Sequence, residues 1–138
     1  MKKKYLPPLL NKKIWKERSQ VSEKWFIHLR DSFCSEFLKL ENVYNHEKGY
    51  QKNTFKQKRW KKDNSEGFGG GVSNILQGNL FEKVGVNISS VCGVFPEDFK
   101  NKIKGANKDP RFFATGISIV AHMKSPFIPA AHFNSRFI

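Results

Sequence analysis

The chain has 138 residues, the usual size of one domain, and its 38% hydrophobic and 14% aromatic content is enough for a folded core. The formal net charge of +13 would attract nucleic acids and other polyanions alike, and most of the positive excess lies before residue 67. No apolar run approaches the roughly 20 residues that cross a bilayer, which excludes a membrane-spanning helix.

Residues 1–18 form a basic lead-in that we expect to be poorly ordered. Its start resembles a signal peptide, but two prolines interrupt the apolar part, a lysine pair closes it, and no small-residue cleavage site follows. Cys34 and Cys92 lack a metal-type spacing and are expected to be free, buried thiols. These features predict a soluble cytoplasmic protein.

A helix is predicted over residues 22–40. Apolar residues recur there every three or four positions, which is the spacing of one stripe of an amphipathic helix, and Ser22 is its expected N-cap. His28 lies beside the stripe and is expected at the solvent edge. The polar stretch 41–53, which contains Gly49, is predicted to be a connection.

A strand is predicted over residues 54–62, anchored by Phe55 and Trp60. The four basic residues around Trp60 either bind phosphate or form a solvated edge that resists unwanted strand pairing. The pattern leaves both interpretations open.

Four glycines fall within residues 67–71, and they lack the spacing of nucleotide-binding loops. They serve either the close approach of a large ligand to bare backbone or a sheet corner. Strands are predicted at 72–76 and 80–94, joined by a turn at 77–79, followed by a short helix at 96–103 and a loop at 105–110.

The chain closes with a predicted hairpin, strands 111–123 and 130–138. Alternation places Ser118, Val120 and His122 on one face of the first strand, and His132, Asn134 and Arg136 on one face of the second. The hypothesis that His122 lies opposite His132, a register that the six-residue connection does not fix, brings the two sets to the same face. The set suggests a binding or catalytic surface for an anionic ligand, although paired histidines also serve as cross-strand packing.

With few helical crossovers between strands, this order of elements predicts an α+β fold with a largely antiparallel sheet.

Four segments resemble the oxygen-dependent coproporphyrinogen III oxidase family: EGFGGGVSNIL (66–76), FEKVGVNISSVCG (81–93), FFATGISIVAH (112–122) and IPAAHFNSRF (128–137). The resemblance implies one domain over residues 1–138, with a large, flat antiparallel sheet flanked by helices. It also implies a homodimer. Because family members continue well beyond the position of Ile138, we expect a truncated or split form that lacks the main dimer contacts.

The resemblance assigns roles to individual residues. Ser118, Asn134, Ser135 and Arg136 would bind substrate, and His132 would be the catalytic proton donor. His122 and His132 would be candidate ligands of a divalent metal.

The implied reaction is the oxidative decarboxylation of two propionates of coproporphyrinogen III to vinyl groups. Molecular oxygen is the co-substrate and no organic cofactor is required. Two alternatives remain: an inactive remnant or half-protein that needs a C-terminal partner, and a small basic nucleic-acid-binding module. The resemblance favours the oxidase, with neither nucleic acid nor membrane as a partner.

Overall fold

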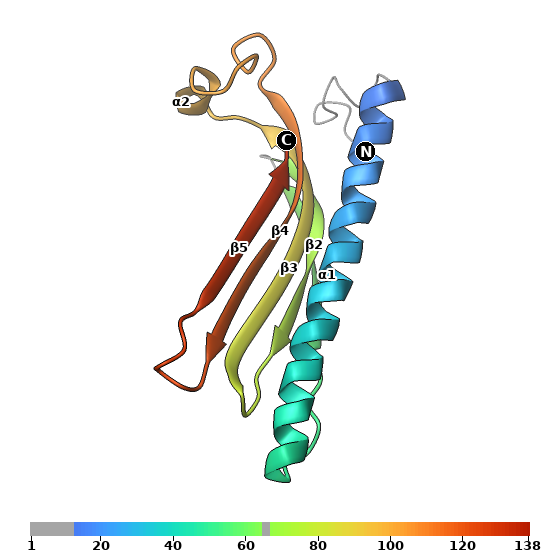
Figure 1. Ribbon diagram of the computed structural model, residues 1–138. Helices are drawn as coiled ribbons and strands as arrows, with labels where there is room; N and C mark the ends of the chain where they lie inside the picture. Colours follow the sequence, from blue (N-terminus) through green and yellow to red (C-terminus); the bar gives the residue numbers. More distant parts are fainter. Residues whose placement is uncertain (1–12, 65–66) are drawn as a thin grey trace.

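The computed structural model describes residues 13–64 and 67–138. Helix α1 (Lys13–Lys48) lies along one face of an antiparallel sheet, and the short helix α2 (Glu97–Lys100) lies at one end of it (Figure 1). The strands are β1 (Lys56–Asn64), β2 (Gly67–Leu76), β3 (Phe81–Val94), β4 (Arg111–Met123) and β5 (Ala131–Phe137). They are adjacent in chain order, β1-β2-β3-β4-β5, which confirms the predicted α+β fold with an antiparallel sheet.

Helix α1 is much longer than the helix predicted over residues 22–40, and both predicted ends are wrong. The stripe that faces the sheet continues in both directions, but its added members Ser19, Glu41 and Asn45 are polar and buried. Because apolar spacing predicts a helix only as far as the stripe is apolar, the predicted helix stops short of these residues. Ser22 is therefore inside the helix. The predicted lead-in is helical from Lys13 onward, and residues 1–12 lie outside the described part of the chain.

The helix ends at Gly49, whose φ of 71° lies in the left-handed region that glycine adopts without strain. The Gly49 N–H donates to the His46 carbonyl at 3.3 Å, and the Tyr50 N–H donates to the Asn45 carbonyl at 2.8 Å. This pair of bonds satisfies two of the last carbonyls of the helix, as in a Schellman motif.

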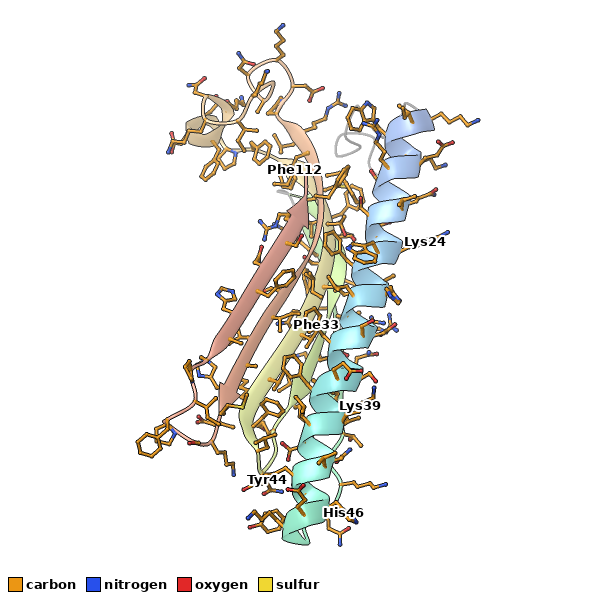
Figure 2. All side chains as sticks on the ribbon, in the orientation of Figure 1. Lys24, Phe33, Lys39, Tyr44, His46 and Phe112 are labelled. Carbon is orange, nitrogen blue, oxygen red and sulfur yellow. The ribbon has the colours of Figure 1, made fainter. Side chains whose placement is uncertain are left out.

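Aromatic side chains fill the space between α1 and the sheet. Phe33 lies there, its ring centroid 5.9 Å from that of Phe133 (Figure 2). Phe37 meets Phe81 edge-on at 5.4 Å. The buried core around them consists of Phe26, Leu76, Phe81, Val84, Val86, Ile117, Ile119 and Ala121.

A buried carboxylate fixes α1 to the turn between β2 and β3. Glu41 accepts hydrogen bonds from the backbone N–H groups of Asn79 at 2.6 Å, Phe81 at 3.1 Å and Leu80 at 3.2 Å. It also accepts one from the side-chain amide of Asn53 at 2.9 Å. Burial alone would raise the pKa of Glu41, but these four donors together lower it below its usual range.

Several smaller predictions are confirmed. The strand predicted at 54–62 is β1, and those predicted at 72–76 and 80–94 are β2 and β3. His28 is exposed, and both cysteines are free, with Cys92 buried and Cys34 half-buried. The glycine run, in contrast, lies inside β2 and not before it. None of the helices in residues 13–64 and 67–138 is both long and apolar enough to cross a bilayer.

Candidate functional site

Helix α1 covers one face of the sheet, and we call the face turned away from α1 the open face (Figure 1). The site predicted on the final hairpin lies on the open face. Ile117 and Ile119 of β4 are buried in the core beneath α1, so the even-numbered side chains of β4 point to the open face. The predicted site residues that share this face are Ser118, His122, His132, Asn134 and Arg136.

The pairing of β4 with β5 differs from the predicted register by two residues. The observed pairs are Val120 with His132, Ser118 with Asn134, and Gly116 with Arg136. A shift of two returns every side chain to its original face, so the predicted grouping holds although the individual pairs were wrong. His122 is not opposite His132. The two are diagonal neighbours, about 7–8 Å apart by typical sheet geometry.

Ser135 differs from the other predicted substrate residues. It pairs with Ile117, whose side chain is buried in the core, and therefore points to the α1 side of the sheet. Its hydroxyl cannot reach a ligand on the open face. Any contact that Ser135 makes there is limited to its backbone.

Three of the predicted residues meet in one depression of the open face. A hollow of about 110 Å³ is lined by residues of four strands, namely Trp60 of β1, Asn87, Ile88 and Ser89 of β3, Gly116, Ile117 and Ser118 of β4, and Asn134 and Arg136 of β5. The hollow therefore combines a guanidinium, two amides, two hydroxyls and an indole.

Consecutive registers join five of the open-face positions into one row that crosses the whole sheet. The row runs Trp60, Gly71, Ser89, Gly116, Arg136. Only the two end positions carry large side chains, so the sheet is recessed between them. The adjacent row, Lys58, Ser73, Asn87, Ser118, Asn134, carries hydrogen-bonding groups at every position.

The open face is electropositive and holds unpaired polar groups. Its paired positions include Lys58 and Arg136 but no Asp or Glu. Among the described residues, the Arg136 guanidinium has no ion-pair or hydrogen-bond partner. A guanidinium with free donors suits a carboxylate, which it can bind through two parallel charge-assisted hydrogen bonds.

Trp60 is the largest of the lining residues that the sequence did not assign to the site; the others are Asn87, Ile88, Ser89, Gly116 and Ile117. A Cβ added to Gly71 would lie 2.7 Å from Cζ2 and 2.8 Å from Cε2 of the indole, so the ring rests directly on the glycine. Gly71 therefore makes room for a side chain of the protein itself, a role that neither the ligand nor the sheet-corner interpretation of the glycines had included. The available signal was the alternation of Trp60 with Lys58 and Lys62, which places all three on one face.

The candidate metal ligands do not form a metal site by themselves. Within residues 13–64 and 67–138 no group of three or more His, Cys, Asp or Glu side chains is placed to hold an ion. His122 and His132 would supply two imidazoles, and stable zinc sites in proteins use at least three protein ligands. We therefore derive no chemistry from a metal.

Comparisons with known proteins identify the family of the chain. A family model described as coproporphyrinogen III oxidase matches residues 21–138. Over 123 residues the chain is 50% identical to the oxygen-dependent coproporphyrinogen-III oxidase of Rickettsia bellii, covering 89% of this chain and 43% of the relative. Over 122 residues it is 49% identical to the Rickettsia africae protein of the same name, covering 88% and 43%.

The chain thus spans less than half the length of the curated relatives that it matches. The matched region nevertheless includes the entire sheet and every residue that lines the hollow. On this evidence, the chain belongs to the coproporphyrinogen III oxidase family.

Proposed function

We propose that this chain supplies the substrate-binding face of an oxygen-dependent coproporphyrinogen III oxidase of heme biosynthesis. The observation that carries the proposal is the meeting of Ser118, Asn134 and Arg136 in one hollow on an electropositive open face. Coproporphyrinogen is broad and carries four carboxylates. A recessed sheet surface has room for the ring, and Arg136 can hold one carboxylate while Asn134 and Ser118 hydrogen-bond further oxygens.

The proposed reaction converts two propionates to vinyl groups and gives protoporphyrinogen IX. In each step a propionic acid side chain and one O₂ yield a vinyl group, CO₂ and H₂O₂, so that the side chain loses two electrons and oxygen gains them. The carboxylate leaves as CO₂, and one hydrogen leaves the side-chain carbon that is attached to the pyrrole ring. His132 lies on the open face two residues before Asn134, and an imidazole can both accept and donate a proton, so we assign it the proton transfer.

Binding can be tested with Arg136→Ala. Hydrogen bonds to charged groups contribute about 1.5–3 kcal/mol, so the variant should bind coproporphyrin III, the stable oxidised form of the substrate, at least roughly tenfold more weakly. Arg59→Ala is the matched control, because Arg59 is an exposed cation of β1 that pairs with core residue Val72 on the other face. Equal affinities of Arg136→Ala and the wild type would contradict the carboxylate contact.

A second proposal follows from the length of the relatives, of which this chain covers 43%. Turnover then requires residues that the relatives carry outside the matched region, and this chain is one half of an active site. The two hypotheses, intrinsic activity and a half-protein, are distinguished by incubation with coproporphyrinogen III under oxygen. The chain is incubated with and without the remaining part of the Rickettsia bellii enzyme. Product from the chain alone supports intrinsic activity, and product only from the mixture supports the half-protein.

The family resemblance also supports proposals on the cellular location and the oligomeric state. We propose a cytoplasmic location and, in the complete assembly, a homodimer. Sedimentation of the chain alone and with the complementary part of the relative tests the dimer. A monomer in both samples would contradict it.

A further inference from the structure

We propose that Trp60 positions the substrate: its indole is the wall of the hollow opposite Arg136 and stacks on one pyrrole ring of the tetrapyrrole. This inference rests on the proposed function, since it takes the ligand from it. It adds a binding residue on β1, the strand at the far edge of the described sheet from β5.

The first support is the seat of the ring. Because Gly71 has no side chain, the indole can rest against the backbone of β2. A Cβ at this position would lie only 2.7 and 2.8 Å from two indole carbons. The residue is 39% exposed. One part of the indole is thus covered by the sheet, and another part remains available to a ligand in the hollow.

The second support is the shape of the row that crosses the sheet. Four strand spacings separate Trp60 from Arg136, roughly 19 Å at the backbone. Both side chains nevertheless line one hollow, and the Trp60 indole extends toward it over Gly71. Between them the row carries nothing larger than Ser89. Such a trough fits a wide, flat ligand held at both ends.

The third support is the chemistry of the two ends. Arg136 offers a charge-assisted fork for a carboxylate, whereas Trp60 offers an aromatic face for a ring. Lys58, two residues before Trp60 on the same face, lies in the row of hydrogen-bonding groups and can meet a second carboxylate. A tetrapyrrole with carboxylates around its rim presents both kinds of group at once.

The test uses the full 138-residue chain and two ligands. Coproporphyrin III carries rings and carboxylates, and butane-1,2,3,4-tetracarboxylate carries carboxylates only. Trp60→Leu should weaken coproporphyrin III binding about tenfold and Trp60→Phe only about threefold, since a phenyl ring retains part of the stacking. Both variants should bind the small tetracarboxylate as the wild type does. Trp25→Phe, an exposed tryptophan on α1, is the matched control and should change neither affinity.

Each remaining result has a defined meaning. If Trp60→Leu binds coproporphyrin III normally while Arg136→Ala does not, the inference is overturned and the proposed function stands. If Trp60→Leu weakens both ligands equally, Trp60 only maintains the shape of the face, and the stacking role is refuted. If Arg136→Ala has no effect, or the wild type binds no coproporphyrin III, the proposed function fails and the inference fails with it.

Discussion

Replacing Glu41 with Gln should destabilise the fold, because in the described part of the chain its carboxylate is the acceptor for three backbone N–H groups at the β2–β3 turn and the start of β3. Glutamine retains one acceptor oxygen, which keeps the bonds to Asn79 and Asn53. Its NH₂ group then faces the N–H groups of Leu80 and Phe81, two donors that have no acceptor left. The side chain of Glu41 is fully buried, so water cannot replace the missing oxygen.

The magnitude follows from these two donors. A buried donor without a partner costs about 1–3 kcal/mol, so the loss of two acceptor contacts in Glu41→Gln should lower the free energy of unfolding by roughly 2–6 kcal/mol. Urea unfolding followed by far-ultraviolet circular dichroism at pH 7 measures the change. Glu47→Gln is the control, since Glu47 is an exposed residue of the same helix and should remain within about 0.5 kcal/mol of the wild type. A Glu41→Gln variant as stable as Glu47→Gln would refute the reasoning.

The same carboxylate predicts a pH dependence. The pKa of Glu41 is lowered in the folded chain, so the stabilisation that it provides is fully present above its ordinary pKa of about 4.5. That contribution is lost as the pH falls through the lowered value. The stability gap between wild type and Glu41→Gln should therefore be constant from pH 7 to pH 5 and shrink only below that range.

Two further predictions concern the glycines and the thiols. Gly71→Ala should cost about 1–3 kcal/mol and change the fluorescence of Trp60, because the added methyl would overlap both the Ile88 carbonyl oxygen and the indole. Gly85→Ala is the control in the same urea assay. Its Cβ would meet its nearest atoms at 3.4 and 3.5 Å, so its stability should stay within about 0.5 kcal/mol of the wild type. Burial raises the pKa of Cys34 and of Cys92 to about 11. Iodoacetamide at pH 7.5 should therefore label both thiols at least roughly a hundredfold more slowly in the folded chain than in urea, as measured by mass spectrometry. Fast labelling of the folded chain would show that the thiols are accessible.

Alternation along single strands allowed the face of the site to be predicted. The period of two places Ser118 with His122, and Asn134 with Arg136, whatever the register. The two pairs share a face because the observed register differs from the predicted one by an even number of residues. The register itself depends on the conformation of the connection 124–129, which the residue types do not specify. Individual cross-strand partners were therefore beyond the reach of the pattern.

The role of Trp60 and the ends of α1 were missed for different reasons. The place of Trp60 in the site follows only if the registers of all four strand pairs are known. An error in any one of them would separate Trp60 from Arg136 in the prediction. The helix ends were misplaced because Ser19, Glu41 and Asn45 are polar residues in buried positions. Each has a local reason to be there: the Ser19 hydroxyl, for example, donates to the Trp15 carbonyl one turn earlier at 2.8 Å. Hydrophobic spacing cannot detect a stripe that is continued by buried polar side chains.

The order of the strands also determines how the molecule can assemble as it is synthesised. Every strand pairs with its neighbour in the chain, so each hairpin can close as soon as its second strand has left the ribosome. Helix α1 is made first but gains its anchor only when the turn bound by Glu41 appears, 38 to 40 residues later. During that interval its aromatic stripe has no sheet to cover it. Chaperone binding to nascent chains should accordingly peak before β3 emerges and fall once it has been made.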